Sequence, residues 1–404
     1  MKPKIRFKGF EGEWKEYSLG EVGSIYSGIG FPECEQGGRS GIPFYKVSDM
    51  NNQGNESIMH SSNNYVSDKQ IQRNHWKICS ETPAIFFAKV GAAVMLNRKR
   101  IVLEPCLCDN NTMMFSLSKD KWSTNFALPL FNNVDFPSLA QVGSLPSFNG
   151  SQVKEIKVKL PKFEEQEMVG KYFTSLDSQI SASTSRLASL KQMKAASLQA
   201  MFPQEGETVP KIRFKGFEGE WKKVSFKDFT FHAGTKNRDN LPLESYSISN
   251  EFVFIPQNEQ FENGGTMTQA DKRMYYIVSP NSFAYNPARI NVGSLGYYEG
   301  KEDVIVSSLY EVFKTDDTIC DKFLLYWFKT NIFQKMIEQF QEGGVRLYFF
   351  YDKMCKCSLK RPSLAEQQAI ASYFTSLDRQ ISLQSQRLEK LKQIKSACLD
   401  KMFV

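Results

Sequence analysis

Two stretches of the chain place apolar residues at the spacing of long helices that pair side by side. Apolar residues recur at a and d positions of a heptad through residues 161–202 and again through residues 362–403. The first set is Leu176, Ile180, Leu187, Leu190 and Met201, and the second is Leu377, Ile381, Leu388, Leu391, Cys398 and Met402. About 40 residues at 1.5 Å per residue predict helical rods of roughly 60 Å.

Helix start signals precede both stretches, and polar residues interrupt both heptad seams. Pro161 and Pro362 come just before the early acids Glu164, Glu165 and Glu366, and Ser363 with Glu366 fits a capping box. The polar seam positions are Ser183, Gln384, Lys194, Lys395 and Ser197. Polar residues at such positions cost stability but fix register and partner number. We expect the two helices to pair with each other; the alternative is that each packs only on its own domain.

Between these stretches the pattern changes to short apolar runs separated by Gly, Asn and Ser clusters, which is typical of strands. The predicted strands are Ala84–Ala88, Ile101–Leu103, Thr112–Ser116, Tyr275–Val278, Val304–Val306 and Tyr310–Phe313. Residues 321–341 have helical spacing instead, with Phe323, Trp327, Ile332 and Met336 on one face. The fold class predicted is α+β, with two such domains joined by the two long antiparallel coiled-coil helices.

A repeat of about 200 residues organises the whole chain. Residues Pro3–Lys15 reappear unchanged as Pro210–Lys222, and residues 161–202 match 362–403 at about 22 of 42 positions. A long-period repeat decides the domain organisation before any local motif does. Residues 17–155 and 223–357 share no obvious similarity. The repeated segments, here called the frame, therefore occur twice around two different inserts. The same partner can bind both copies of the frame, while the two inserts can bind two different targets.

This repeat predicts six segments along the chain. They are an N-terminal repeat segment (1–16), a first insert domain (17–155), a central long helix (156–202), a linker with the second repeat segment (203–222), a second insert domain (223–357) and a C-terminal long helix (358–404).

Charge and composition narrow the classes of protein without deciding among them. The chain of 404 residues has a net charge of +7, yet residues 17–155 hold 12 basic and 12 acidic residues and residues 223–357 hold 15 and 17. Bulk charge therefore permits DNA binding only if each insert is basic on one face. The N-terminus is basic and polar, and the longest apolar stretch, Ile85–Leu96, contains Lys89 and is too short to span a bilayer. We expect a cytoplasmic protein without a membrane partner.

Cysteine spacing and catalytic motifs give no sign of a metal site or an enzyme. Cys106/Cys108 and Cys355/Cys357 are Cys-x-Cys pairs rather than zinc-type pairs, so reduced, partly buried thiols are expected. No phosphate-binding loop, dinucleotide fingerprint, His-Glu-x-x-His or nucleophile turn is present in the sequence. The nearest approach is Asn286-Pro287-Ala288-Arg289, where a base-flipping methyltransferase would have Asn/Asp-Pro-Pro-aromatic. An Arg at the last position loses base stacking and gains a ligand for phosphate or guanine.

Four motifs, in order inside the duplicated frame, resemble the DNA-specificity subunit of type I restriction–modification enzymes. They are Gly41–Asn51 in the first insert, Tyr285–Ser294 in the second, and the Pro-x-x-x-Glu-Gln openings of the long helices in Leu160–Gln166 and Arg361–Gln367. The resemblance covers essentially the whole chain.

This resemblance implies a non-catalytic reader of DNA. Each insert would be a target-recognition domain that docks in the major groove of one half of a bipartite, asymmetric site, and the antiparallel helices would hold the two apart about a pseudo-twofold axis. The frame would bind two methyltransferase subunits, which carry S-adenosylmethionine and methylate adenine, and two restriction subunits that use ATP and Mg²⁺ could join. No cofactor or metal is expected in this chain.

Side chains that can contact DNA cluster in the Gly/Asn-rich loops of both inserts. Arg and Lys pair with guanine or phosphate, and Asn pairs with adenine. The candidates are Arg39, Lys46, Lys89, Asn97, Arg98 and Lys99 in the first insert, and Lys236, Asn237, Arg238, Arg289, Asn291 and Arg346 in the second. For each, the alternative is a solvated surface charge or a phosphate contact that carries no sequence information. The aromatics Phe86, Phe87, Tyr348, Phe349 and Phe350 are expected in cores rather than stacked on bases.

Two other functions remain open at this point. One is a structural adaptor whose two inserts bind different proteins or glycans. The other is a self-sufficient enzyme, against which the absence of cofactor motifs argues.

Overall fold

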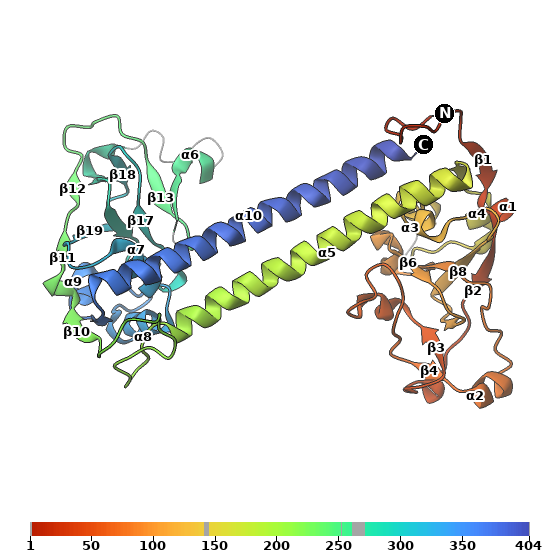
Figure 1. Ribbon diagram of the computed structural model, residues 1–404, viewed down its shortest axis with the longest axis horizontal. Coiled ribbons are helices and arrows are strands. Elements are labelled where there is room, and N and C mark those ends of the chain that lie inside the picture. Colours follow the sequence, from red (N-terminus) through yellow and green to blue (C-terminus); the bar gives the residue numbers. More distant parts are fainter. Residues whose placement is uncertain (1, 141–144, 252, 261–270, 404) are drawn as a thin grey trace. The chain divides into compact units, whose positions relative to one another are not determined.

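The computed structural model describes residues 2–140, 145–251, 253–260 and 271–403, and the chain divides into two compact units (Figure 1). Unit 1 comprises Met1–Thr184 with Gln386–Val404, and unit 2 comprises Ser185–Ser385. Each unit therefore holds one of the two inserts, the first part of one long helix and the last part of the other.

Unit 1 is built on a four-stranded antiparallel sheet of order β2-β8-β5-β6, with a three-stranded sheet β4-β3-β7 beside it. Its strands are β1 (Lys15–Ser18), β2 (Gly23–Ser27), β3 (Ile42–Tyr45), β4 (Tyr65–Val66), β5 (Ala84–Ala88), β6 (Lys99–Val102), β7 (Leu107–Cys108), β8 (Thr112–Leu117) and β9 (Lys157–Leu160). Its short helices are α1 (Leu19–Val22), η1 (Glu33–Glu35), η2 (Val47–Asn51), α2 (Asp68–Arg73), η3 (Ala92–Leu96), α3 (Thr124–Asn133), η4 (Pro137–Leu139) and α4 (Gly150–Glu155). Every residue of β5 and β8 is buried, because other elements cover both faces of the central strands.

Unit 2 repeats this plan with different sequence and register. Its four-stranded antiparallel sheet has the order β11-β19-β16-β17, beside smaller sheets β12-β15-β18 and β13-β14. The strands are β10 (Lys222–Ser225), β11 (Thr230–His232), β12 (Thr235–Lys236), β13 (Tyr246–Ile248), β14 (Phe254–Pro256), β15 (Tyr276–Val278), β16 (Ser282–Tyr285), β17 (Leu295–Tyr298), β18 (Val304–Val306), β19 (Glu311–Thr315) and β20 (Ser358–Arg361). The short helices are η5 (Phe226–Asp228), α6 (Gln257–Gln260), η7 (Lys272–Met274), η8 (Ile290–Val292), α7 (Asp321–Trp327), α8 (Asn331–Phe340) and α9 (Tyr351–Met354).

The strands predicted from apolar runs are confirmed to within two residues at each end, and the predicted helical segment 321–341 is helical but interrupted. Residues 321–341 form two helices, α7 and α8, rather than one. Thr330 adopts an extended backbone (φ −87°, ψ 155°) at the start of α8, and its hydroxyl donates to the carbonyl of Trp327 at 2.7 Å. A side chain that bonds the preceding turn in this way competes with helix continuation, so the apolar spacing runs on through a break.

The repeated frame closes each unit with the same two-stranded ribbon. In unit 1, β1 pairs antiparallel with β9, and in unit 2, β10 pairs antiparallel with β20 in the same register. The Trp that precedes each ribbon is buried in its unit's core, as Trp14 and Trp221. An aromatic from the end of a long helix contacts each Trp edge-on, Phe403 in unit 1 and Phe202 in unit 2.

The two long helices are α5 (Phe163–Ala200) and α10 (Leu364–Met402), and in both units part of one runs antiparallel to part of the other (Figure 1). In unit 1, Lys395 Nζ lies 2.5 Å from Asp177 Oδ1, and in unit 2, Lys194 Nζ lies 2.5 Å from Asp378 Oδ1. Helix pairing is thus confirmed, and the polar seam positions Lys194 and Lys395 pair with acids of the opposite helix. No helix within the described residues is long and apolar enough to cross a membrane.

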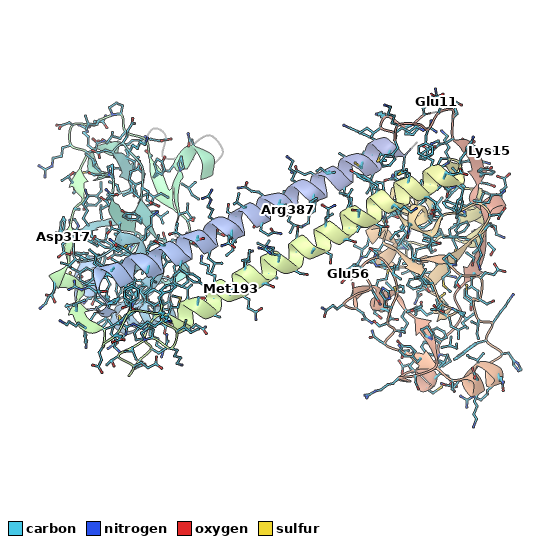
Figure 2. The ribbon with its side chains drawn as sticks, viewed as in Figure 1. Glu11, Lys15, Glu56, Met193, Asp317 and Arg387 are labelled. Carbon is cyan, nitrogen blue, oxygen red and sulfur yellow. The ribbon has the colours of Figure 1, made fainter. Side chains whose placement is uncertain are left out.

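The long helices also carry exposed side chains on their surfaces. Figure 2 shows Met193 on α5 and Arg387 on α10, and Met193 is about half exposed.

Candidate nucleic-acid interface

An Arg–Glu clasp joins the repeated N-terminal segment to the long helix in each unit. Arg6 Nε and Nη2 both lie 2.7 Å from the carboxylate oxygens of Glu165, and Nη1 donates to the carbonyl of Gly12 at 2.6 Å. The Glu165 side chain is 3% exposed, and the hydrogen bond to Glu165 raises the pKa of Arg6. Trp14 Nε1 donates to the same carboxylate at 3.3 Å.

Unit 2 repeats this clasp on the second copy of the segment. Arg213 Nε and Nη2 lie 2.8 Å from the Glu366 carboxylate, and Nη1 donates to the Gly219 carbonyl at 2.6 Å. The Ser363 hydroxyl accepts from the Glu366 backbone N–H at 3.4 Å, as expected for an N-cap. The other half of the predicted capping box is wrong, because the Glu366 carboxylate binds Arg213 rather than its own helix terminus.

The Gln that follows each Glu ties the recognition domain to the same helix. Gln166 Oε1 accepts from the backbone N–H of Ser123 at 3.0 Å, and its Nε2 donates to the carbonyl of Lys121 at 2.8 Å. Gln367 makes the equivalent contacts with Cys320 N–H (2.8 Å) and the Thr318 carbonyl (3.3 Å). The Glu-Gln pair therefore fixes both the frame and the insert to each helix, which sets the direction in which each insert faces.

Two of the candidate residues of the first insert follow strands of different sheets in unit 1, β5 of the central sheet and β3 of the three-stranded sheet. Lys89 directly follows β5 and donates to Ser27 Oγ at 2.7 Å, and Lys46 directly follows β3 and donates to Gln36 Oε1 at 3.2 Å. Both lie around the turn at Asp109, where burial raises the pKa of the carboxyl while the Lys46 charge opposes that rise. Ser27 and Gln36 were not among the candidates; Gln36 precedes the Gly-rich loop that contains Arg39, which was the available signal.

Arg39 and Arg98 are the other accessible candidates of the first insert. Arg39 is exposed in the Gly-rich loop before β3. Arg98 is half-buried, and its Nη1 donates to Asn51 Oδ1 at 2.6 Å.

Lys99 is wrong as a DNA contact, because it is buried. It is 1% exposed, and its Nζ donates to Asn97 Oδ1 at 2.7 Å and to the Val134 carbonyl at 2.6 Å. Removal from water lowers the pKa of Lys99 from 10.5 to about 7. Asn97 belongs to the same interior network, since its Nδ2 also donates to Val134 at 3.1 Å and its backbone adopts the left-handed conformation that ends η3.

In the second insert, Arg289 and Asn291 lie exposed on one loop. The Asn286 side chain accepts from the Ala288 N–H at 3.0 Å, which makes Asn286–Ala288 a tight turn that presents Arg289. Arg289 Nη2 lies 3.4 Å from Asn250 Oδ1, so Asn250 joins this group although the sequence did not single it out.

The remaining candidates of the second insert divide into accessible and buried ones. Arg346 and Arg238 are exposed, and Lys236 is half-buried on β12. Asn237 is 1% exposed, and its amide closes the loop by donating to the Leu241 carbonyl (3.0 Å) and accepting from the Leu241 N–H (2.8 Å). Its prediction as a DNA contact is therefore wrong.

The five aromatics that were expected in cores divide in the same way. Phe86, Phe87 and Phe349 are buried, as expected, whereas Tyr348 is half-buried and Phe350 is exposed, which contradicts the expectation for Phe350.

The eight cysteines are free thiols, and burial raises the pKa of Cys108 and Cys357 to about 12, which keeps these thiols neutral. Within the described parts of the chain, no three His, Cys, Asp or Glu side chains are grouped as metal ligands would be.

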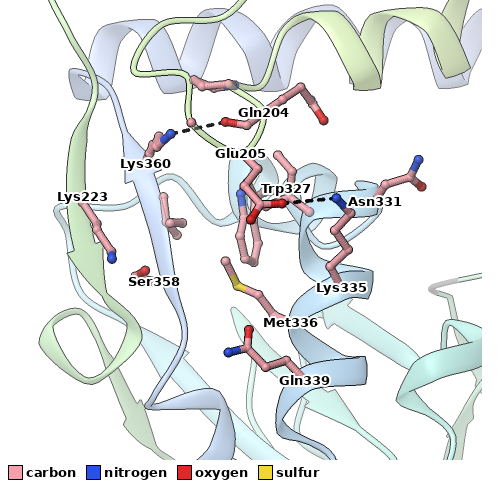
Figure 3. A pocket seen from close by; sticks show the side chains of 14 residues that line it. Gln204, Glu205, Lys223, Trp327, Asn331, Lys335, Met336, Gln339, Ser358 and Lys360 are labelled. Carbon is pink, nitrogen blue, oxygen red and sulfur yellow. Dashed lines mark hydrogen bonds and ion pairs between the residues drawn. The ribbon is translucent and has the colours of Figure 1, made fainter.

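A cavity of about 350 Å³ in unit 2 lies between the linker after α5, strand β20 and helix α8 (Figure 3). Lys360 donates to the carbonyls of Gln204 and Glu207, and Lys335 Nζ lies 3.3 Å from Glu205 Oε2. These lysines hold the linker in place rather than converge on a ligand.

In each unit an Arg–Glu clasp joins the repeated segment to a long helix, and the next Gln joins the α+β insert to the same helix. The profile of the family described as "Type I restriction modification DNA specificity domain" matches residues 11–192 and again 218–393. The chain therefore belongs to this family and carries its domain twice.

Known relatives agree with this membership. A protein of Methanocaldococcus jannaschii, provisionally named as the specificity subunit of the type I restriction enzyme MjaX, is 21% identical over 279 residues. That match covers 63% of this chain and 60% of the relative, so the chain spans about three fifths of the curated protein it matches.

Solved structures share the fold. The S subunit of a type I restriction–modification system from M. genitalium matches with a TM-score of 0.59 at 11% identity, over 100% of this chain and 99% of its own. A chain from a type I R-M system, studied for complex assembly and conformational transition, matches with a TM-score of 0.53 at 15% identity, over 97% and 98%.

Proposed function

We propose that the chain is the non-catalytic specificity subunit of a type I restriction–modification complex and reads a bipartite, asymmetric DNA site. The observation that carries this proposal is the same clasp in both units, Arg6–Glu165 and Arg213–Glu366, on inserts that differ in sequence. A constant frame suits a constant partner, and two different inserts suit two different half-sites. The family description supports DNA as the target.

In this proposal, residues 17–155 and 223–357 are the two target-recognition domains, and accessible side chains of each contact DNA. These side chains are Arg39, Lys46, Lys89 and Arg98 in the first domain and Lys236, Arg238, Arg289, Asn291 and Arg346 in the second. Their cationic groups suit phosphate oxygens or the guanine edge, and the Asn291 amide suits adenine.

The partners are those that the family resemblance implies, and the repeat supports two copies of each. Two methyltransferase subunits bind the two copies of the frame and supply S-adenosylmethionine and adenine methylation, and two restriction subunits add ATP- and Mg²⁺-dependent cleavage. The complex works in the cytoplasm. A measured mass of the complex saturated with methyltransferase tests the stoichiometry: two copies per chain support it, and one copy contradicts it.

The function is tested by mapping methylated adenine across a genome with and without this gene. A single bipartite motif that loses methylation on deletion supports the proposal. An unchanged methylation pattern, together with a purified complex that binds duplex DNA without sequence preference, would favour a structural adaptor instead.

Single residues are tested with a matched pair of lysines in unit 1. Lys89 follows β5 at the Asp109 end of the central sheet, and Lys119 lies exposed just past the opposite end of β8. Six residues of strand separate these ends by about 20 Å. Lys89→Met should weaken DNA binding and reduce its salt dependence, whereas Lys119→Met should leave both unchanged.

A further inference from the structure

A short hairpin in unit 2 joins α8 to α9 and presents side chains that the fold of the unit does not use. Glu342 and Tyr348 exchange both backbone hydrogen bonds, at 2.9 Å and 2.8 Å, and so close a loop over residues 343–347.

The loop is held in one shape by its own backbone and by two anchors. Gly343 has φ +140°, and a Cβ there would lie 2.1 Å from the carbonyl oxygen of Arg346, so only glycine fits. Glu342 forms an ion pair with Lys353 Nζ at 2.6 Å. Phe349 is fully buried beneath the hairpin, and its N–H donates to the Pro287 carbonyl at 3.0 Å. The base of the hairpin is therefore anchored to unit 2 on both sides of the tip.

The side chains at the tip are apolar and cationic, and they are exposed. Val345 is fully exposed, Leu347 is 44% exposed, and Arg346 is exposed between them. Tyr348 and Phe350 stack at the base with ring centroids 5.4 Å apart and planes 3° from parallel. Residues 343–350 contain no acidic residue. Packing of unit 2 does not require a valine or an arginine at these positions, because neither side chain is buried.

The hairpin stands beside the loop that presents Arg289 and Asn291. The bond from Phe349 to Pro287 joins the hairpin to the turn that places Arg289, whose guanidinium lies next to Asn250. The base of the hairpin with the exposed apolar tip is thus bonded to the loop that carries the cationic and amide side chains. Proteins that read DNA combine these features, since cations bind phosphates and apolar side chains contact thymine methyl groups or press against base steps.

We propose that residues 342–348 form a finger that enters a groove of the half-site read by unit 2, where Val345 contacts bases and Arg346 binds a phosphate. The inference rests on the proposed DNA-reading function and adds to the candidate Arg346 an apolar base contact at Val345, which charge did not indicate. Because Val345 supplies an apolar contact, its loss should change affinity without changing the number of phosphate contacts.

The test uses the full chain assembled with its methyltransferase partner and a duplex that carries the methylated motif. Val345→Ser should weaken binding by about fivefold, as expected for losing one buried apolar contact, and should leave the salt dependence unchanged. Arg346→Ala should reduce the slope of log K against log salt by about 0.9, the value for one phosphate contact. Leu309→Ser is the matched control, because Leu309 is 71% exposed on the loop between β18 and β19; it should bind like the wild type.

Three outcomes would overturn the inference. If wild-type binding is specific for the motif but Val345→Ser and Arg346→Ala match it in affinity and salt slope, the finger does not touch DNA. If either variant loses methyltransferase and keeps its DNA affinity, the hairpin docks a protein. If the wild-type complex shows no preference for the motif, the proposed function itself fails. Thermal unfolding of both variants should match the wild type, since both side chains are exposed.

Discussion

Removing Arg6 tests whether the clasp fixes the frame to the long helix. Two hydrogen bonds of 2.7 Å join Arg6 to Glu165, and the side chains are 15% and 3% exposed, so the pair is largely shielded from water. In Arg6→Ala, the Glu165 carboxylate loses both guanidinium hydrogen bonds and keeps the 3.3 Å hydrogen bond from Trp14 Nε1. Removing one partner of a buried ion pair lowers the free energy of unfolding by about 3–5 kcal/mol, because the other charge stays buried without its partner.

We expect Arg6→Ala to lower the free energy of unfolding by about 3 kcal/mol, near the lower end of that range, because the Arg6 side chain is partly exposed to solvent. That is a large fraction of the stability of a typical domain, about 5–15 kcal/mol. Urea unfolding of the full chain measures the free energy of unfolding of unit 1. Arg213→Ala should produce the equivalent loss in unit 2, because its clasp has the same geometry.

Two further variants separate the clasp from general effects. Lys8→Ala changes an exposed cation of the same segment and should cost less than about 0.5 kcal/mol. The double variant Arg6→Met/Glu165→Met removes both charges and should recover most of the loss, since apolar replacements of a buried pair are often neutral. An Arg6→Ala protein within about 1 kcal/mol of wild type would refute the reasoning, because Glu165 would then not depend on its partner.

Three other predictions follow from the helices and the buried lysine. Between about pH 7 and 10.5 the unfolded chain binds more protons at Lys99 than the folded chain does, because folding lowers the pKa of Lys99. The free energy of unfolding of the wild type should therefore rise with pH in this window, by up to about 1.4 kcal/mol per pH unit. Lys99→Met should flatten this rise, measured by urea unfolding at a series of pH values. An equal slope in both proteins would show that Lys99 is not buried uncharged. Asp177→Lys should lower the stability of unit 1 by about 1 kcal/mol and Lys395→Asp added to it should restore it, whereas no recovery would mean that the pair makes no contact in solution. Four residues added after both Ser183 and Gln384, about 6 Å of helix, should lengthen the unread spacer of the DNA motif by one or two base pairs of about 3.4 Å, and an active variant with its spacer unchanged would show that the helices do not set it.

Local patterns in the sequence predict the strands and the long helices, because each depends on residues close in sequence. Ala84–Ala88 is a continuous apolar run and becomes β5 with the same limits. The break at Thr330 is not visible in the same way, since apolar spacing continues across it and only the hydroxyl contact with Trp327 reveals the helix start.

The contacts that position the sites depend on residues far apart in the chain. Arg6 and Glu165 are 159 residues apart, so the repeat shows that both matter but not that they touch. The charge of Lys99 suggested an accessible side chain, but the residue is buried. It lies on β6, a strand of a sheet that is covered on both faces, so its position in the strand places the side chain in the interior. Asn237 failed for a related reason, since an amide in an Asn-rich loop can close that loop rather than face a ligand.

The most direct test of the account is to replace residues 17–155 with the corresponding insert of another family member and to map methylated adenine by genome sequencing. Because the frame contacts of unit 1 come from Arg6, Trp14 and Glu165, outside that insert, the exchange leaves the clasp intact. The account predicts that one half of the bipartite motif changes while the other half stays the same. A change in both halves, or in neither, would contradict two independent readers on a shared frame.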